Sequence, residues 1–366
     1  MTTFSALGLK KEIVHVLSKL NFKEPLDVQE KIIPLAMAGK NIVFTSRTGS
    51  GKTLAYLLGF VPKFNTKLGL QMVVMVPTRE LCIQVGKEMK RVCDLLNIKV
   101  GMLYGGREMA GDYKTTDKKI NIMVGTPGRL IQHINAKNIR VGEVKYLVYD
   151  ESDQMFDQGF ADECVYVKQR ANVHAQIILA SATITYKVEQ FMEEEIGEYE
   201  FLKIGELVPK NIVQEKIFCT IEEKKEVLLH FLQNNNFKRI MIFCNTKNKT
   251  ADITLFLSKQ GYRARELNSN LTQDERFNTL NLFKDGKIHV LVTTDVAARG
   301  LQIEKVDAVI NYDAPTKAEF YVHRIGRTGR RDKAGYCISL ICPEDEDRFR
   351  IIEYNFGLDV KEKIGR

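Results

Sequence analysis

The sequence predicts an α/β protein with two domains in tandem, each built on a mainly parallel sheet flanked by helices. Short apolar runs alternate with amphipathic stretches along most of the chain, which is the pattern of β-α-β units. The alternation pauses after residue 204 at a short segment containing glycine and proline, and then restarts. The chain has 366 residues, and at roughly 150 residues per domain this length also suggests two domains.

The first domain is expected to cover residues 1–207. Apolar residues recur at helical spacing over residues 9–20, and a turn then leads to a second helix over residues 29–37. A further helix is expected over residues 81–96. The expected strands are 42–44, 72–76, 100–103, 120–124, 146–149, 177–179 and 201–204.

Residues 208–212 are expected to be a linker, and residues 213–366 the second domain. The expected strands there are 217–219, 240–243, 289–293, 308–311 and 336–341, with helices over 225–233, 250–260 and 273–283. Residues 343–366 combine an acidic turn with an amphipathic helix, which we expect to pack against the domain.

Composition narrows the class of protein. The chain is 44% hydrophobic and 27% charged, as in ordinary globular proteins. Its net charge of +8 fits a polyanionic partner without demanding one. The seven cysteines lack C-x-x-C spacing, so we expect free thiols in a reducing, intracellular compartment, nucleus, nucleolus or cytoplasm. No apolar run reaches the ~18 residues of a membrane span, and we expect no membrane association.

A phosphate-binding loop is the strongest chemical signal. The apolar run 42–44 leads into a loop and then into a helix-like stretch, and the loop contains Ser46, Arg47, Thr48, Gly49, Ser50, Gly51, Lys52 and Thr53. Its glycines allow successive backbone N–H groups to point into one concavity at a helix N-terminus, which suits phosphate. Lys52 would reach the phosphates of ATP, and Thr53 would bind Mg²⁺. The alternative is a glycine-rich turn with an accidental Lys-Thr pair.

Acidic residues follow the apolar run 144–149. Asp150 and Glu151 would lie at the carboxyl end of a parallel strand, where ligands bind in open α/β sheets. Beside a phosphate loop, Asp150 is the natural Mg²⁺ partner and Glu151 the candidate general base for the attacking water. Taken alone, the same residues would suit an acidic helix N-terminus.

An arginine-rich turn stands in the second half, at residues 321–330. Arg327 and Arg330 are candidate arginine fingers, because guanidinium groups stay charged and bind phosphate oxygens bidentately. Such fingers contribute about 10³–10⁵ in rate. The alternatives are a solvated basic face and a patch for the RNA backbone.

Several strings occur in a fixed order: PTREL at 77–81, GG at 105–106, TPGR at 126–129, DESD at 150–153, SAT at 181–183, TDVAARG at 294–300 and HRIGRTGR at 323–330. In that order the chain resembles the DEAD-box family of ATP-dependent RNA helicases (superfamily 2), from Phe4 to about Cys342. The resemblance implies two RecA-like domains, RNA-stimulated ATP hydrolysis with ATP and Mg²⁺, and RNA, as a single strand or short duplex, bound mainly through its backbone.

The resemblance also implies roles for individual residues. Gln29 would read adenine, and Phe4 or Phe22 would stack on or support the base. Gly300 and Gln302 would lie near the ribose of ATP. The implied RNA contacts are Arg79, Gly105, Gly106, Thr126, Gly128, Arg129, Asn245, Arg276 and Thr294. The residues implied to couple the state of ATP to the grip on RNA are Asp153, Ser181, Thr183, Asp295 and His323.

The chain departs from the family pattern at three places. Ser152 gives DESD in place of DEAD, and a small serine should preserve catalysis. Residues 25–29 read PLDVQ, where we expect altered local rigidity. Gln302 replaces an aspartate that accepts a ribose hydroxyl, so we expect weaker coupling between nucleotide and domain closure.

Two other functions compete with the helicase. A non-catalytic, ATP-gated RNA clamp or scaffold would explain Ser152 and Gln302, but it would not need Lys52, Asp150 and Glu151. A DNA helicase fits the ordered strings less well. We expect a monomer that relies on a protein adaptor or ribonucleoprotein complex to choose its target, and large-subunit ribosome assembly is the first process we would test.

Overall fold

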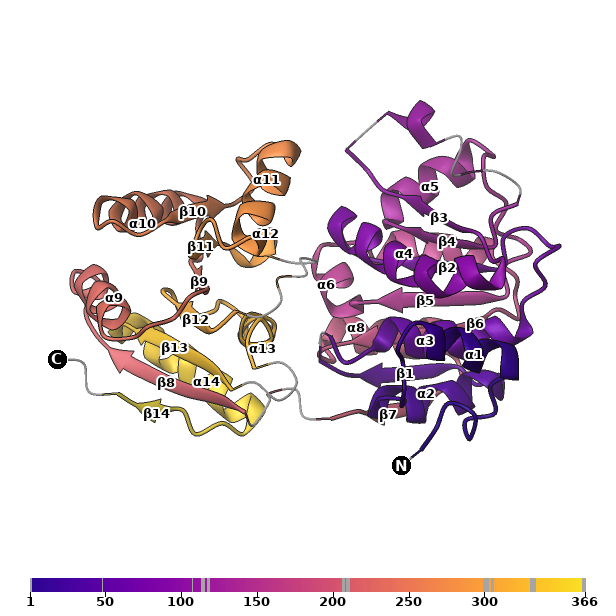
Figure 1. The fold of residues 1–366 in the computed structure, drawn as a ribbon, viewed down its shortest axis with the longest axis horizontal. Helices are drawn as coiled ribbons and strands as arrows, with labels where there is room; N and C mark the ends of the chain where they lie inside the picture. Colours follow the sequence, from indigo (N-terminus) through magenta and orange to yellow (C-terminus); the bar gives the residue numbers. More distant parts are fainter. Residues whose placement is uncertain are drawn as a thin grey trace. The chain divides into compact units, whose positions relative to one another are not determined.

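The computed structural model describes residues 2–47, 49–106, 108–112, 116, 119–205, 208, 211–298, 303, 306–329 and 334–363. The chain forms two compact units, Met1–Gly205 and Glu206–Arg366, each with its own seven-stranded sheet (Figure 1). Every strand pairing in the described residues is parallel. This confirms the predicted pair of α/β domains. No helix in the described part of the chain is long and apolar enough to cross a bilayer.

The sheet of the first unit has the strand order β3-β4-β2-β5-β6-β1-β7. Because neighbouring strands of this sheet are parallel, the chain must cross over between them, and the helices of these connections cover both faces. The strands are β1 (Ile42–Thr45), β2 (Met72–Met75), β3 (Val100–Leu103), β4 (Ile122–Gly125), β5 (Tyr146–Asp150), β6 (Gln176–Ser181) and β7 (Glu200–Lys203).

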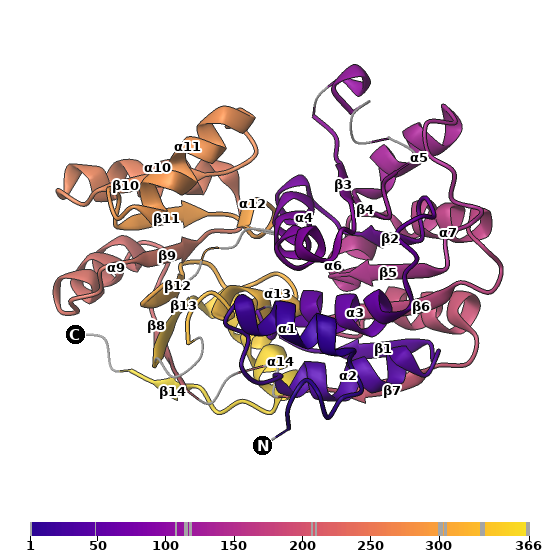
Figure 2. The ribbon, with the colours of Figure 1, turned by 45° about the vertical axis from the view of Figure 1, so that its right-hand side comes forward.

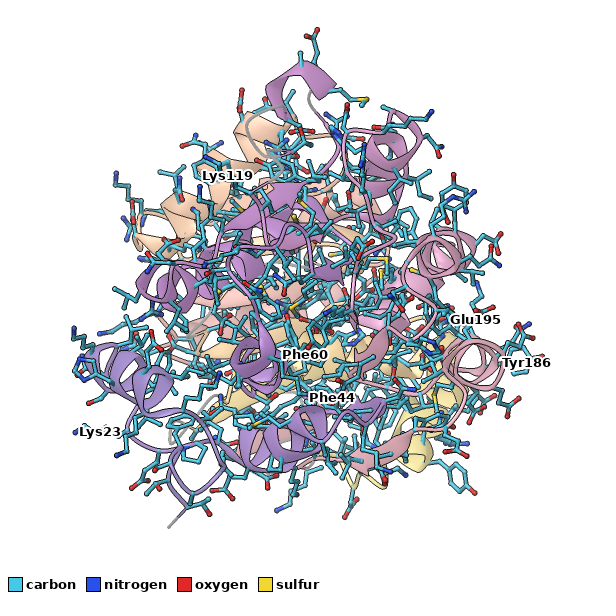
Figure 3. The ribbon with its side chains drawn as sticks, turned by 90° about the vertical axis from the view of Figure 1, so that its right-hand side faces the viewer. Lys23, Phe44, Phe60, Lys119, Tyr186 and Glu195 are labelled. Carbon is cyan, nitrogen blue, oxygen red and sulfur yellow. The ribbon has the colours of Figure 1, made fainter. Side chains whose placement is uncertain are left out.

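Both faces of this sheet are buried, since neighbouring residues of one strand enter different hydrophobic clusters. Phe44 packs with helices α1–α4, whereas Val43 packs with α5–α8. Figure 3 shows Phe44 and Phe60 in the interior and Lys23 and Tyr186 at the periphery. The helices are α1 (Lys11–Lys19), α2 (Asp27–Met37), α3 (Lys52–Phe60), α4 (Arg79–Cys93), α5 (Pro127–Asn135), α6 (Ser152–Asp157), α7 (Ala161–Arg170) and α8 (Tyr186–Phe191), with short helical turns η1 (Val61–Lys63), η2 (Asp94–Leu96), η3 (Met109–Asp112) and η4 (Met192–Ile196).

The sheet of the second unit has the order β10-β11-β9-β12-β13-β8-β14 and is also covered on both faces (Figure 2). Phe243 packs with residues of α11–α14, and Ile242 packs with residues of α9 and α10. The strands are β8 (Ile212–Phe218), β9 (Ile240–Phe243), β10 (Ala264–Leu267), β11 (Val290–Thr293), β12 (Ala308–Asn311), β13 (Gly335–Ile341) and β14 (Lys361–Glu362). The helices are α9 (Lys224–Gln233), α10 (Lys247–Lys259), α11 (Gln273–Lys284), α12 (Asp295–Ala298), α13 (Ala318–Ile325) and α14 (Glu346–Phe356), with the turn η5 (Pro343–Asp345).

The sequence expectations about the second unit need correction at three places. The expected linker 208–212 includes Ile212, but Ile212 already begins β8 and pairs with Gly335. The expected strand 217–219 covers only the end of β8, because the polar residues 214–216 interrupt the apolar pattern of that strand. Strand β10 was not expected, since Arg265 and Glu266 break its apolar run.

Candidate active site

The phosphate-binding loop joins β1 to α3 in the predicted way. Gly51 is the N-cap of α3 with a φ of 94°, a left-handed conformation that favours glycine. A Cβ atom there would also lie 2.6 Å from Nε2 of Gln29, so no larger residue fits without a shift. Gly49 likewise has a positive φ of 78°. Thr48 lies outside the described residues.

Gln29 contacts the loop directly. Its Oε1 accepts a hydrogen bond from the backbone N–H of Leu26 (2.9 Å), and its Nε2 donates to the carbonyl of Gly51 (3.3 Å). The side chain is 3% exposed, so α2 and the loop are joined by a buried amide. Of the two candidate stacking rings, Phe4 is buried in the core and Phe22 is half-buried, 5.8 Å from the guanidinium of Arg91.

Further bonds hold the loop in place. The backbone N–H of Ser46 donates to the carbonyl of Ser181 on β6 (2.9 Å), and its hydroxyl bonds to that of Ser50. The Lys52 ammonium donates to the Ser46 carbonyl (3.3 Å) and is buried with Thr53 in the first turn of α3. Arg47 remains partly exposed beside the loop. The loop is therefore fixed to two strands before any ligand binds.

The carboxylates at the end of β5 face this loop. Glu151 has a φ of 54° and accepts an ion-pair hydrogen bond from Lys52 at 2.8 Å, with both side chains about 5% exposed. Its other oxygen accepts from Nε2 of Gln154 (3.2 Å). Asp150 accepts from the Tyr56 hydroxyl (3.1 Å) and from the N–H of Glu151 (3.0 Å). The loop lysine and the candidate base thus lie in one buried cluster.

Burial and charge set the protonation of this cluster. Burial alone would lower the pKa of the Lys52 ammonium, but the charges of Glu151 and Asp150 outweigh it and raise that pKa. At Asp150 burial prevails over the attraction of Lys52 and raises the pKa of the carboxyl to about 6. Lys52 is therefore charged at neutral pH, whereas ionised Asp150 lacks full compensation for its lost hydration.

Asp153 joins β5 to β6 through the SAT segment. Its Oδ2 accepts hydrogen bonds from the hydroxyl (2.7 Å) and the N–H (2.9 Å) of Thr183, and its own N–H donates to Oγ of Ser181 (3.2 Å). Ser181 in turn donates to the carbonyl of Thr183 (2.7 Å). Ser152 is fully buried in α6, and its hydroxyl has no hydrogen-bond partner within the described residues. The variant position of DESD is thus accommodated without a bond.

The expected RNA contacts of the first unit meet at one edge of its sheet. Arg79 follows β2, Gly105 and Gly106 follow β3, and Thr126 and Gly128 follow β4. These strands are neighbours in the order β3-β4-β2, so the segments after them lie side by side at the carboxyl edge.

Two arginines at this edge make internal contacts. The Arg79 guanidinium lies 4.9 Å from the ring centre of Tyr104. Arg129 is only 7% exposed, and it donates from Nε to Asp112 (2.8 Å) and from Nη1 to Gln132 (3.0 Å). The sequence suggested Arg129 only as an RNA contact, whereas the structure also gives it an internal partner.

The second unit repeats this arrangement. Asn245 follows β9, Arg276 lies in α11 after β10, and Thr294 follows β11, and these strands are neighbours in the order β10-β11-β9. Arg276 donates from Nη2 to the carbonyl of Ala297 (3.3 Å). Nδ2 of Asn245 donates to the carbonyl of Ala314 (2.9 Å). The side-chain amide of Asn245 therefore already serves an internal bond.

Arg324 is the centre of the polar network in this unit. It is 1% exposed, and it donates from Nε and Nη2 to the two oxygens of Asp295 (2.6 and 2.7 Å). Nη2 also donates to Oδ1 of Asn245 (3.0 Å), and Nη1 to the carbonyl of Asp313 (2.7 Å). Asp295, expected to couple ATP and RNA, is thus linked to Asn245 through Arg324, and His323 precedes Arg324 on α13.

Arg327 lies in the turn that follows α13. Its N–H donates to the carbonyl of Arg324 (3.2 Å), and the next hydroxyl, that of Thr328, donates to the carbonyl of Val306 (2.7 Å). Gly329 has a φ of 64°, and a Cβ atom there would lie 2.3 Å from Ile212. The backbone bearing Arg327 is therefore closely fixed. Arg330, Gly300 and Gln302 lie outside the described residues.

Sequence reasoning missed three contributors, Tyr56, Gln154 and the internal role of Arg324. Helical spacing could have suggested two of them, because Tyr56 lies one turn after Lys52 and Gln154 one turn after Glu151. The bonds of Arg324 join segments far apart in the chain, and no local pattern signals them.

Comparisons with known proteins agree with this geometry. A family model for DEAD/DEAH box helicases matches residues 26–191, and one for the helicase conserved C-terminal domain matches residues 223–332. The fold is similar to that of S. cerevisiae Dbp5 bound to RNA and ADP BeF3, with a TM-score of 0.90, 28% identity, and coverage of 100% of this chain and 96% of that one.

Curated relatives match over nearly the whole chain. The ATP-dependent RNA helicase CshA of Listeria monocytogenes is 36% identical over 356 residues, which are 96% of this chain and 68% of the relative. A probable ATP-dependent RNA helicase of Methanocaldococcus jannaschii is 35% identical over 359 residues, 98% of this chain and 97% of the relative. The chain therefore belongs to the DEAD-box family and is an ATP-dependent RNA helicase with two RecA-like domains.

Proposed function

We propose that the buried cluster of Lys52, Asp150 and Glu151 is the centre of ATP hydrolysis. The observation that carries this is the 2.8 Å Lys52–Glu151 pair beside a fixed phosphate loop. When the phosphates of ATP bind, they offer Lys52 a new anionic partner, so Glu151 is released to take a proton from the attacking water. Gln154 keeps hold of the other Glu151 oxygen and limits its rotation.

Mg²⁺ fits the same cluster. Asp150 is a buried carboxylate that forms no ion pair with any described residue and accepts hydrogen bonds only from Tyr56 and the Glu151 N–H. A site of this kind gains from a divalent cation, and oxygen ligands suit Mg²⁺. Asp150 and the Thr53 hydroxyl would hold the ion, which would neutralise charge on the phosphates. Tyr56 then orients the carboxylate.

RNA would lie along the carboxyl edges of the two sheets. At the first, Arg79, Gly105, Gly106, Thr126 and Gly128 offer a guanidinium, small backbone amides and a hydroxyl, which bind phosphate and ribose without reading bases. At the second, Arg276 and Thr294 would act in the same way. Asn245 would act mainly by holding Arg324 and the nearby backbone, given its internal bonds.

The turn after α13 would supply positive charge to the transferred phosphate. Arg327 stands on a backbone fixed by the bonds of Thr328 and by the close approach at Gly329. We assign Arg327 the role of arginine finger, with Arg330 as the second candidate. Asp153, Ser181 and Thr183, together with Asp295 and His323, would transmit the state of the nucleotide to the grip on RNA.

The choice of polynucleotide can be tested by ATP hydrolysis. RNA and DNA oligonucleotides of one sequence should be titrated into the protein, and turnover measured with saturating ATP and Mg²⁺. We expect strong stimulation by RNA and little by DNA, because 2′-hydroxyl contacts and strand shape favour RNA. Equal stimulation would contradict the proposed RNA interface, and stimulation by neither would favour an ATP-gated clamp.

A separate part of the proposal concerns the compartment, the protein partner and the cellular process. All seven cysteines are free and buried, which supports a reducing intracellular compartment. S. cerevisiae Dbp5 has been solved bound to Gle1 and IP6, and that precedent supports a protein adaptor for this chain as well. We propose a monomer recruited by such an adaptor, with large-subunit ribosome assembly as the first process to examine. Sequencing the RNA crosslinked to the protein in cells would test that process.

A further inference from the structure

Asp112 is a buried carboxylate that no motif of the sequence singles out. It ends the turn η3 on the segment between β3 and β4. Its side chain is 0% exposed, and its Oδ2 accepts from Nε of Arg129 (2.8 Å) and lies 3.0 Å from Nε2 of His133. Both partners belong to α5, so one carboxylate holds two residues of that helix.

The bonds around His133 define how the carboxylate is held. Nδ2 of Asn138 lies 3.1 Å from Nδ1 of His133, and an amide nitrogen can only donate. Nδ1 therefore accepts, and Nε2 carries the proton that it donates to Asp112. Gln132 takes a further hydrogen bond from Arg129 (3.0 Å). The carboxylate is thus the anionic centre of a polar network in the first unit.

Such a network is poor evidence for stability alone. Taking a carboxylate and a guanidinium out of water costs several kcal/mol, and well-packed apolar residues often serve a fold equally well. What the network does provide is orientation, because an arginine fork bound at two nitrogens has little rotational freedom. Its location also matters, since Asp112 comes six residues after Gly106, and Arg129 comes directly after Gly128.

We propose that Asp112 is a positioning residue for RNA binding. By holding Arg129 and His133, it ties the turn η3, which comes after Gly105 and Gly106 in the chain, to α5. The loops after the neighbouring strands β3 and β4, which pair at Leu103 and Gly125, then present their backbone amides on one surface. This inference rests on the proposed RNA interface at the carboxyl edge of the first sheet, and it assigns a chain segment outside the recognised motifs to that interface.

The test compares two isosteric changes in the first unit. Asp112→Asn removes the anionic centre, whereas Glu195→Gln removes another carboxylate, which pairs with Lys168 at 2.7 Å between η4 and α7. ATP turnover is titrated with RNA, well below the melting temperature of each variant, and the RNA concentration for half-maximal stimulation is recorded.

Asp112→Asn should raise that RNA concentration about tenfold, while Glu195→Gln should change it less than about twofold. RNA-independent turnover and the KM for ATP should stay within about twofold for both variants, because neither touches the nucleotide site. Because Asp112 acts partly through Arg129, the loss of RNA affinity in the Asp112→Asn/Arg129→Gln double variant should be smaller than the sum of the losses in the two single variants.

If Asp112→Asn lowers the melting temperature but leaves the RNA concentration for half-maximal stimulation unchanged, the inference is overturned and Asp112 contributes to stability alone. Fully additive losses in the double variant would also overturn it, because Asp112 would then act independently of Arg129. Absence of RNA stimulation in the unchanged protein would instead contradict the RNA interface itself, so the two failures are distinguishable.

Discussion

Replacing Ser152 with alanine should stabilise the protein without changing its catalysis. The Ser152 side chain is 0% exposed, and its hydroxyl bonds to no described residue. An unsatisfied buried polar group costs about 1–3 kcal/mol, and alanine favours the first turn of α6 by up to about 0.5 kcal/mol. The lost contacts of one oxygen atom offset part of this gain. We expect a net stabilisation of about 1 kcal/mol, which raises the Tm of a unit of this size by about 2–4 °C.

Ser181 provides a matched control in the same unit. It is equally buried, but its hydroxyl accepts from the N–H of Asp153 and donates to the carbonyl of Thr183. Ser181→Ala should therefore lower stability by about 1–3 kcal/mol. Thermal unfolding and RNA-stimulated ATP turnover are measured for both variants, and Ser152→Ala should keep turnover within about twofold. Equal destabilisation by the two changes would refute the reasoning about Ser152.

The other predictions concern three buried polar side chains, those of Asp150, Arg324 and Gln154. In metal-free buffer, Asp150→Asn should be more stable than the unchanged protein at pH 7.5 by about 3 kcal/mol, because a shift of about two pKa units corresponds to that free energy. The pKa of Asp150 is raised to about 6, so the free-energy cost of its ionised carboxylate in the folded protein is absent below about pH 4 and grows as the pH rises to 6. Chemical unfolding at pH 4 should therefore show no gain in stability from Asp150→Asn, and a gain at that pH would contradict this origin. Arg324→Lys should destabilise the second unit by about 3 kcal/mol, because lysine cannot serve both oxygens of Asp295 and the amide of Asn245; an unfolding midpoint unchanged from that of the original protein would exclude it. Gln154→Leu should lower kcat about tenfold with little change in the KM for ATP, and unchanged kcat would show that Glu151 needs no such support.

Local patterns predicted most of the fold because both sheets are buried on both faces. Such strands read as continuous apolar runs, and the strands at 100–103, 240–243 and 308–311 have the predicted bounds. The errors at strands β8 and β10 have the same cause. Strand β8 is half-exposed near the edge of its sheet, and β10 is an edge strand, so polar residues interrupt their apolar pattern.

The site was predictable where the chemistry is local. The phosphate loop and the carboxylates after β5 combine residue type with a strand end, which one stretch of sequence shows. The contacts of Gln29 with Gly51, of Tyr56 with Asp150 and of Asp112 with Arg129 depend on how separate elements pack. No spacing rule fixes such packing, so those roles needed the structure.

The catalytic role of Glu151 is tested most directly by its isosteric removal. RNA-stimulated ATP hydrolysis and ATP-dependent RNA binding should be measured together for the unchanged protein and for Glu151→Gln. Loss of a general base should reduce turnover by about 10²–10⁴, while RNA binding in the presence of ATP and Mg²⁺ should be at least as tight. Turnover close to that of the unchanged protein would contradict the assignment of the Lys52–Glu151 cluster as the centre of hydrolysis.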